Sequence, residues 1–392
     1  MLSSPRRLLL ILHELSLTGA PKIAFEALRA LPDLEIRTIA LDDGPFADNF
    51  RTLGTLQIFS DLPDWKGAVS RRRRQIAQRM WSRDLRRWQP DLIYVNSVAA
   101  LPVARFIALP PGVPVLLHVH ELDTYLARAA RQHPDLLLNW PAQYIAVSEA
   151  VRTALVRHGV DKAKVEVIHE FVADETLGCL SASTAAAQQP MGEVRPFLVG
   201  GGGKIQWRKG STLWLQMARE LADRVGEARV RFVWVGVGEG EPDQQFREEA
   251  RQLNVAHLIE FVPITRDPLA HFARCDAFAM TSWEDPCPIV VLEAMTLEKP
   301  VVCFAGGGGA AEEVGETGLV IAEFSPAKMA EALAALRNRP EQMRALGRAA
   351  RERVRTHFTA SVQVPKIQRE INRLTANHSG GALGESGLRE KG

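Results

Sequence analysis

The 392-residue chain lacks several features that would define its class at once. Its four cysteines form no C-x-x-C pair and no metal-ligand spacing, which excludes a predicted zinc site and indicates reduced, cytosolic thiols. Apolar runs are short: the one near the start, Leu8–Leu12, has five residues, fewer than the ~7–15 of a signal-peptide core or the ~20 of a membrane span. The net charge of only +2 implies no global electrostatic partner. We therefore expect a soluble, cytoplasmic protein.

The chain does have many short apolar runs, each followed by a segment that can form a helix. One series extends from residues 8–13 to 165–169, and a second from 197–203 to 319–322. Continuous runs rich in β-branched residues, separated by helical patterns, indicate parallel strands covered on both faces. The sequence therefore predicts two doubly wound α/β domains facing each other across a cleft.

Composition marks the ends of these domains. Residues 174–196 are rich in Ser, Ala, Gln and Pro and have no periodic apolar face, which indicates a linker. We expect an N-terminal domain over 1–180 and a second domain over 190–355. The small, polar tail 375–392 is typical of a disordered segment.

A glycine-rich basic loop follows the first apolar run of the second series. The stretch "LVGGGGKIQWRKGSTLWLQMARELA" includes Gly203, Lys204, Arg208 and Lys209, and an amphipathic helix follows. Glycine lets the backbone approach phosphate oxygens, and a helix N-terminus offers N–H groups and a partial positive charge. The three cations would neutralise a diphosphate. A solvated glycine turn is the alternative, because the loop matches neither a Walker A loop nor G-x-G-x-x-G.

Two carboxylates flank an apolar run farther along, in "TSWEDPCPIVVLEAMTLEKPVV". Seven residues separate Asp285 from Glu293, and the run Ile289–Leu292 lies between them. Carboxylates accept paired hydrogen bonds from vicinal hydroxyls, as on a ribose or a hexose. The alternative is that both acids merely complement the N-terminal end of a helix.

Together, the basic loop and the acid pair resemble the donor-binding domain of family 4 retaining glycosyltransferases, also called glycosyl transferases group 1. The family pattern is a glutamate, seven residues, a glutamate and then "AM…G.PVV", and "DPCPIVVLEAMTLEKPVV" has this shape. The stretches "CDAFAMTSWED", "GGGGAAEEVGETGLVI" and "RAARERVRTHFT" add to the resemblance, which is strongest over 197–359. It implies the GT-B fold of two Rossmann-like domains. It also implies a last helix, around 357–374, that crosses back onto the N-terminal domain.

The resemblance assigns roles to the acids and cations. By position, Glu293 would hold the nucleotide ribose and Asp285 the hydroxyls of the transferred sugar. Asp285 is shorter than the usual glutamate, and the adjacent Glu284 could compensate. Lys209 matches the family lysine at the diphosphate.

Two departures from the family pattern affect the donor site. Lys204 stands where an arginine is usual, and Arg208 is the candidate to restore the planar guanidinium. Pro286 and Pro288 replace residues whose backbone N–H groups usually contact the sugar, and proline has none. The amides of Cys287, Ile289 and Val290 remain as candidates for such contacts.

In the N-terminal half the resemblance singles out a glycine and a histidine. Gly19 in "LTGAPKIAFEAL" matches the glycine turn near donor phosphates and acceptor. In "HVHEL", His120 matches a histidine that faces the sugar better than His118 does. The alternative for the two histidines is that one packs inside and the other is solvated. The sequence offers no third metal ligand beside the two histidines and no D-x-D motif, so we expect no bound metal.

The segment 65–88 is basic and contains three tryptophans. It has nine basic residues and a single acid, Asp84, with Trp65, Trp81 and Trp88 interleaved. Such a helix could lie on an anionic membrane with tryptophans at the interface. The alternative is a solvated helix whose tryptophans pack on the domain. Nucleic-acid binding is the weaker hypothesis, and we expect no nucleic-acid partner.

Together with these observations, the resemblance implies a metal-independent, hexosyltransferase-type enzyme without a cofactor. A UDP- or GDP-linked sugar would be transferred, with retention of configuration, to a glycan or lipid-linked glycan in cell-envelope polysaccharide or lipopolysaccharide synthesis, at the inner face of the membrane. His120, Lys209 and Asp285 are the candidate catalytic residues. No nucleophilic carboxylate is evident in the N-terminal half, which favours a front-face displacement. A nucleotide-sugar epimerase and an inactive GT-B binding or scaffold subunit remain as alternatives.

Overall fold

The computed structural model describes residues 5–60, 70–107, 109–179 and 195–384. Two compact units make up the chain: one comprises residues up to His169 and from Gln363 onward, and the other comprises Glu170–Val362. Residues 170–179, expected in the first domain, thus fold with the second. The Val172 N–H donates to Phe358 O at 2.9 Å, and the Ala360 N–H donates to Val172 O at 3.0 Å. These two backbone bonds tie the early segment to the end of the second unit.

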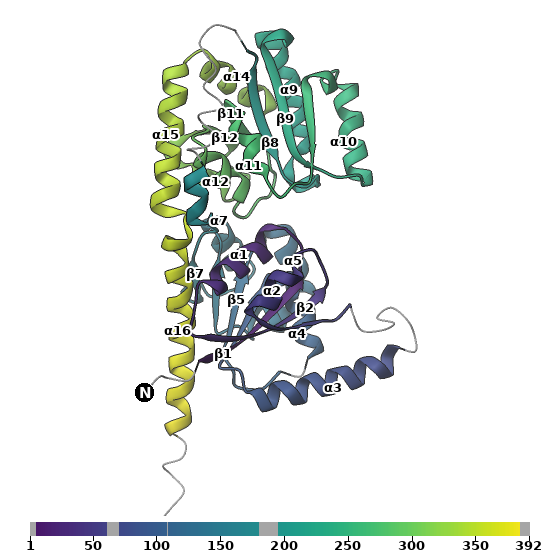
Figure 1. The fold of residues 1–392 in the computed structure, drawn as a ribbon, viewed down its shortest axis with the longest axis vertical. Helices are drawn as coiled ribbons and strands as arrows, with labels where there is room; N and C mark the ends of the chain where they lie inside the picture. Colours follow the sequence, from purple (N-terminus) through teal and green to yellow (C-terminus); the bar gives the residue numbers. More distant parts are fainter. Residues whose placement is uncertain (1–4, 61–69, 108, 180–194, 385–392) are drawn as a thin grey trace, which may run out of the picture. The chain divides into compact units, whose positions relative to one another are not determined.

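The first unit is built on a seven-stranded, fully parallel sheet with the order β3-β2-β1-β4-β5-β6-β7 (Figure 1). The interior strand β1 contains Leu8–Leu12, all of them almost completely buried. Helices connect the strands as in other parallel sheets. The strands are β1 (Arg6–Glu14), β2 (Leu34–Asp42), β3 (Gly54–Ile58), β4 (Leu92–Asn96), β5 (Val115–Val119), β6 (Gln143–Ala146) and β7 (Val165–Val167); the helices are α1 (Gly19–Arg29), α2 (Ala47–Leu53), α3 (Ser70–Trp88), α4 (Leu101–Phe106), α5 (Asp123–Gln132), α6 (Pro134–Leu138) and α7 (Glu149–Arg157).

The second unit repeats this design with six parallel strands in the order β10-β9-β8-β11-β12-β13 (Figure 1). Its strands are β8 (Phe197–Gly202), β9 (Val230–Val237), β10 (Ile259–Pro263), β11 (Ala277–Met280), β12 (Val301–Phe304) and β13 (Leu319–Ile321). Its helices are α9 (Ser211–Val225), α10 (Glu241–Gln252), α11 (Pro268–Ala273), α12 (Ile289–Thr296), α13 (Ala310–Val314), α14 (Pro326–Arg337) and α15 (Pro340–His357).

Alternation along β9 shows how the second sheet is covered on both faces. Phe232 and Trp234 belong to a core that also contains residues of α9, α10 and α14. Val233 and Val235 point the other way, into a core with residues of α11, α12 and α15. Successive side chains of a strand point to opposite faces, so one apolar run supplies both cores. The predicted doubly wound architecture is confirmed in each unit.

The last helix, α16 (Ala360–Gly384), joins the first unit from Gln363 onward. It extends beyond the predicted 357–374, so residues 375–384 of the expected disordered tail are helical. Leu374 and Thr375 are buried, and the Thr375 hydroxyl donates to Ile371 O at 3.0 Å. Packing of these side chains carries the helix into a segment whose composition alone favours disorder. Residues 385–392, and most of the predicted linker (180–194), lie outside the described residues.

In the part of the chain that the structure describes, no helix is both long and apolar enough to cross a bilayer.

Candidate functional site

In open parallel sheets, ligands bind beyond the carboxyl ends of the strands where the strand order reverses. In the second unit this point lies between β8 and β11, which are neighbours although β9 and β10 separate them in sequence. The basic loop follows β8 and the acidic loop follows β11, so the topology brings the two predicted motifs together. Backbone bonds join them: the Trp283 and Glu284 N–H groups donate to Arg208 O at 2.8 and 3.1 Å.

Gly210 makes this close approach of the two loops possible. It has a left-handed backbone (φ 61°) at the N-terminus of α9, after a short 3₁₀ turn over Trp207–Lys209. A Cβ atom at this position would lie 2.0 Å from Thr281 O. Only glycine meets both requirements, because other residues rarely adopt this φ and all carry a Cβ. The turn therefore fixes Lys209 at the edge of the acidic loop.

Lys209 and Asp285 form a buried ion pair. Lys209 Nζ lies 2.5 Å from Asp285 Oδ2, and the two side chains are only 13% and 5% exposed. Arg208 Nη1 lies 3.9 Å from the other carboxylate oxygen. The backbone of Asp285 is held as well, through hydrogen bonds with Gly307 and Gly309 at 2.8 and 2.9 Å. Residues predicted to contact different parts of a donor are thus bonded to each other.

The other predicted residues of the basic loop surround this pair. Lys204 is exposed, and Gly203 has a φ of 123° and packs against the Lys209 side chain. Arg208 is half-buried and donates from Nε to Gln206 Oε1 at 3.0 Å. An anionic ligand at this loop would therefore meet three cations, two of which, Arg208 and Lys209, already form ion pairs with Asp285.

The predicted residues of the acidic loop lie at the start of α12. Ile289 and Val290 form its first turn, where backbone N–H groups have no acceptor within the helix. Glu293, one turn later, is 6% exposed. Glu284 is half-buried beside Asp285, and Cys287 is buried before the helix begins. All five therefore belong to one continuous segment around the switch point.

Glu313 is a buried acid next to this loop that the motifs did not identify. Cys287 Sγ donates to its Oε1 at 3.0 Å, and among the described residues Oε2 has no hydrogen-bond partner. Burial raises the pKa of Glu313 well above its ordinary value, and burial likewise raises the pKa of the Cys287 thiol. Burial therefore disfavours the charged form of both groups. The doubled "EE" of α13 offered no signal to tell the buried glutamate from the solvated one.

The first unit has its own switch point, between β1 and β4, and it carries a polar network. Gly19 begins α1 directly after β1. Asn96, at the end of β4, donates to Ala20 O at 3.0 Å and lies 3.0 Å from His120 Nε2. His120 is half-buried beyond β5. Sequence reasoning missed Asn96, although a polar residue that ends an apolar strand is the signal that could have found it.

His118 is the inward-pointing member of the histidine pair. It is 1% exposed, and its Nδ1 lies 2.7 Å from the Tyr94 hydroxyl. Burial, together with the nearby His120, lowers the pKa of His118 well below its ordinary value. The two rings are tilted by 40° to each other, with centroids 4.1 Å apart. His118 therefore belongs to the core, and among the two only His120 is placed to reach a ligand.

The tryptophans of α3 pack on the first unit instead of facing outward. Trp88 is 7% exposed, and its Nε1 donates to Glu35 Oε1 at 2.6 Å. Trp81 packs edge-on against Phe59, with ring centroids 4.6 Å apart. The prediction of interfacial tryptophans is wrong for these two, because partners on and after β2 and β3 bury Trp88 and cover part of Trp81. Trp65 lies outside the described residues.

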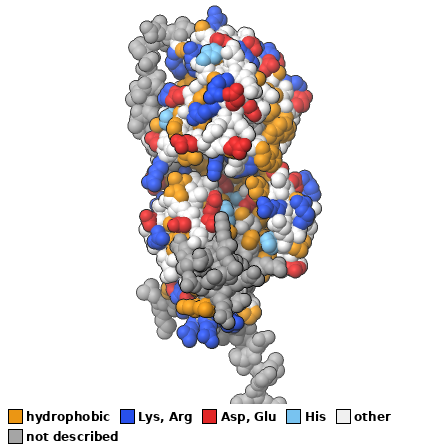
Figure 2. All heavy atoms as spheres, turned by 90° about the vertical axis from the view of Figure 1, so that its right-hand side faces the viewer, with side chains coloured by type: hydrophobic (Ala, Val, Ile, Leu, Met, Phe, Trp, Pro, Cys, Tyr) orange, Lys and Arg blue, Asp and Glu red, His pale blue; other side chains and the backbone are white. Residues whose placement is uncertain are grey.

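The exposed apolar residues of α3 are Ile76 and Met80, at 56% and 64%. Figure 2 shows hydrophobic and basic side chains next to each other at the lower end of the view. Arg79 and Arg83 are exposed on the same helix. A basic helix with an apolar side therefore exists, but its apolar residues differ from the predicted ones.

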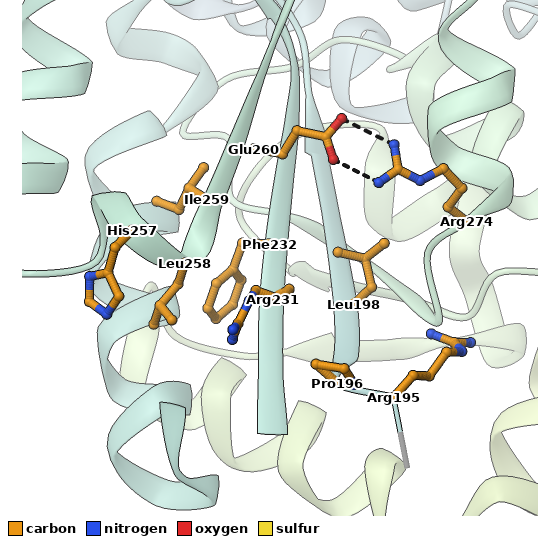
Figure 3. Close-up of a pocket in the computed structure, with 10 residues that line it drawn as sticks. All are labelled: Arg195, Pro196, Leu198, Arg231, Phe232, His257, Leu258, Ile259, Glu260 and Arg274. Carbon is orange, nitrogen blue, oxygen red and sulfur yellow. Dashed lines mark hydrogen bonds and ion pairs between the residues drawn. The ribbon is translucent and has the colours of Figure 1, made fainter. Parts of the chain in front are cut away.

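A cavity of about 560 Å³ lies at the opposite end of the second sheet, at the amino ends of β8, β9 and β10 (Figure 3). Its charged groups are mostly paired: Glu260 bonds Arg274 through both oxygens at 2.7 and 3.0 Å, and Arg195 bonds Asp276. No predicted site residue lines it. We therefore place the candidate site at the carboxyl end of the sheet.

Among the described residues, no cluster of three His, Cys, Asp or Glu side chains could hold a metal ion.

Comparison with known protein families identifies the family of the chain. A family model described as Glycosyltransferase Family 4 matches residues 18–176, and one described as Glycosyl transferases group 1 matches residues 197–339. Together the two matches cover most of both units. The chain belongs to the family 4 glycosyltransferases.

Two curated relatives of this glycosyltransferase are D-inositol 3-phosphate glycosyltransferases. The one from Kribbella flavida is 30% identical over 213 residues, covering 52% of this chain and 50% of the relative. The one from Rhodococcus jostii is 32% identical over 255 residues, covering 60% and 56%. The matches thus span about half the length of these relatives.

Solved structures share the fold of this glycosyltransferase. HepE from Anabaena, in complex with UDP and glucose, has a TM-score of 0.74 at 19% identity, covering 94% of this chain and 99% of HepE. Sucrose-phosphate synthase from Thermosynechococcus elongatus has a TM-score of 0.71 at 17% identity, covering 95% and 100%. These similarities establish the GT-B fold that the sequence predicts.

Proposed function

We propose that this glycosyltransferase moves a sugar from a UDP- or GDP-linked donor to a glycan or lipid-linked glycan acceptor, with retention of configuration and without a metal. The observation that carries the proposal is the Lys209–Asp285 pair beside Arg208, at the switch point of the second unit. The HepE structures, which contain UDP, glucose or UDP-glucose, support a nucleotide-sugar donor. Synthesis of a cell-envelope polysaccharide such as lipopolysaccharide is the proposed role.

The leaving diphosphate makes the largest electrostatic demand on such a reaction. Positioned cations in a water-poor site stabilise charge that develops in the transition state, and here Lys209 and Arg208 would do so. A diphosphate would compete with Asp285 for the Lys209 ammonium. Asp285 would then accept hydrogen bonds from the transferred sugar, while Glu293 holds the ribose.

A front-face displacement fits these residues. In this step the acceptor oxygen forms its bond to the anomeric carbon on the side from which the diphosphate departs. The departing phosphate oxygen takes the acceptor's proton, so no enzyme carboxylate is consumed. Lys204, Arg208 and Lys209 would bear the charge of the leaving group.

The basic helix α3 supports a further part of the proposal, contact with an anionic membrane at the inner face of the cell membrane. Ile76 and Met80 would enter the headgroup region while the arginines bind lipid phosphates, each contributing about 1 kcal/mol near the surface. Sedimentation with anionic and with neutral vesicles tests this, since equal recovery with both would contradict it.

Thermal unfolding in the presence of UDP- and GDP-linked sugars, with and without EDTA, tests donor binding. A donor at a hundred times its Kd stabilises the folded state by about 2.7 kcal/mol, and EDTA should leave the shift unchanged. Product analysis by NMR follows, with the same anomer expected in donor and product. An inverted product would overturn the mechanism, turnover of the donor sugar without acceptor would indicate an epimerase, and binding without turnover would indicate a binding subunit.

A further inference from the structure

A small polar network joins three segments at the carboxyl edge of the first sheet. Asn96 ends β4 and is completely buried. Its Nδ2 donates to Ala20 O in the first turn of α1, at 3.0 Å. Its Oδ1 lies 3.0 Å from His120 Nε2, beyond β5. One side chain therefore connects the glycine turn with the candidate catalytic histidine.

The orientation of the Asn96 amide follows from its partners. The carbonyl oxygen of Ala20 can only accept a hydrogen bond, so the NH₂ group of Asn96 must face it. The amide oxygen must then face the imidazole, and it too can only accept. Nε2 of His120 must therefore carry a proton, and in the neutral ring the lone pair lies on Nδ1.

The backbone next to Asn96 is strained, and its surroundings hold it in place. Ser97 has φ 87° and ψ 140°, a conformation that residues with a side chain rarely adopt. Its N–H donates to His118 O at 2.7 Å, and its hydroxyl donates to Glu121. Strain of this kind costs about 1–3 kcal/mol and persists where surrounding contacts enforce it, often at functional sites.

Glu121 fixes the other side of the network. Its Oε2 accepts from the backbone N–H groups of Val98 and His120, at 3.2 and 3.0 Å. The loops after β4 and β5 are thereby joined through one carboxylate. The backbone of His120 and its ring are thus held by separate anchors, Glu121 and Asn96.

We infer that Asn96 is a positioning residue that holds His120 in the tautomer with its proton on Nε2. Under the proposed function, on which this part rests, the ring held in this way is the one that faces the bound sugar. The tautomer itself follows from the contacts of the first unit alone.

Histidine NMR of the donor-free, full-length protein tests the tautomer without any transfer reaction. Long-range proton–nitrogen spectra of ¹⁵N-histidine-labelled protein, with His120 assigned through His120→Gln, should show Nε2–H in the wild type. Asn96→Asp keeps an acceptor for Nε2 and should retain this tautomer. Asn96→Leu, of similar size, removes the acceptor and should shift the population toward Nδ1–H. Asn139→Leu, an exposed asparagine of the same unit, should change nothing.

An Nδ1–H signal for wild-type His120 would overturn the inference, and so would an unchanged tautomer in Asn96→Leu. The wild-type spectrum decides the matter even if a variant fails to fold.

Kinetics test the consequence for transfer. Once the donor is known, Asn96→Leu should lower kcat about ten- to hundred-fold through misplacement of the ring, with donor KM nearly unchanged, and Asn96→Asp should lower it less. Wild-type kcat in Asn96→Leu would contradict the positioning role. A protein with the expected tautomers and no transfer from any donor would instead contradict the proposed function.

Discussion

The second sheet has a carboxylate–cation pair at each end, and the two pairs differ in burial. At the amino end, Glu260 and Arg274 form two hydrogen bonds, but their side chains are 44% and 53% exposed. At the carboxyl end, Lys209 and Asp285 share a single short contact and are 13% and 5% exposed. The pair with the better hydrogen-bond geometry is thus the one that water reaches.

This difference in burial separates an exposed pair that the fold merely tolerates from a buried pair whose charges are kept available for a ligand. An exposed pair contributes about 0–1 kcal/mol, and salt screens it. Removing one partner of a buried pair leaves an uncompensated charge and costs about 3–5 kcal/mol. A desolvated Lys209–Asp285 pair gives the folded state no more stability than an apolar pair would. We therefore infer that these residues are retained to bind a ligand.

Lys209→Met is the substitution that we expect to separate the buried pair from the exposed pair most clearly. Loss of the cation should lower the transfer rate about 10²–10³-fold, because a positioned charge at the leaving group is lost. Steady-state kinetics with the identified donor measure this. Arg274→Met, at the exposed pair, is the matched control and should leave the rate unchanged. Equal rates in the wild type and Lys209→Met would remove Lys209 from the site.

Gly210→Ala tests whether the glycine turn holds the buried pair together. The new Cβ would meet Thr281 O at 2.0 Å and force a strained φ, so we expect a loss of several kcal/mol, more than the roughly 1–3 kcal/mol of backbone strain alone. Gly226→Ala, at the other end of α9, has a φ of 89° and no atom within 4 Å, so it isolates the strain. Chemical denaturation should show the larger loss for Gly210→Ala, and equal losses would contradict the close approach.

Glu313→Gln extends the comparison to a buried acid that has no cation partner among the residues that the structure describes. Its pKa is raised in the folded state, so its stabilising effect is complete below the ordinary glutamate pKa and is lost as the pH rises toward the folded value. Replacing the acid with a neutral amide removes that loss. The melting temperature of Glu313→Gln should therefore exceed that of the wild type by a few degrees at pH 8 and by less at pH 5. A gain that is larger at pH 5 would contradict the assignment.

The smallest effect is expected at the exposed pair itself. Arg274 lowers the pKa of Glu260, so the pair stabilises the fold at neutral pH and loses this contribution as the pH falls through that lowered value. Because both side chains are partly in water, Arg274→Met should cost less than about 1 kcal/mol, and still less in high salt. Urea denaturation at two salt concentrations measures this, and a salt-independent loss would show that solvent does not screen the pair.

The sequence predicted what depends on local pattern. Short apolar runs placed most of the strands, though not β2 and β3, and the glycine-rich loop followed by a helical pattern placed the start of α9. Composition placed the end of α16 wrongly, because burial of Leu374 is decided by tertiary packing.

The sequence could not predict which residues far apart in the chain contact each other. Lys209 and Asp285 are 76 residues apart and were given separate partners, whereas the fold pairs them. Trp88 was expected at a membrane because its partner Glu35 on β2 is 53 residues away. Asn96 and Glu313 belong to no sequence motif. Only the residues that surround them in the structure identify them as parts of the candidate sites.

The return of α16 to the first unit has a consequence for biosynthesis. Because that unit comprises the residues up to His169 and those from Gln363 onward, the second unit is an insertion within it. The inserted segment begins and ends side by side, through the backbone bonds of Val172 with Phe358 and Ala360. On the ribosome the inserted unit can therefore finish folding while the unit that was started first still lacks its last helix, and an exchange of donor domains between relatives would need two junctions at neighbouring points.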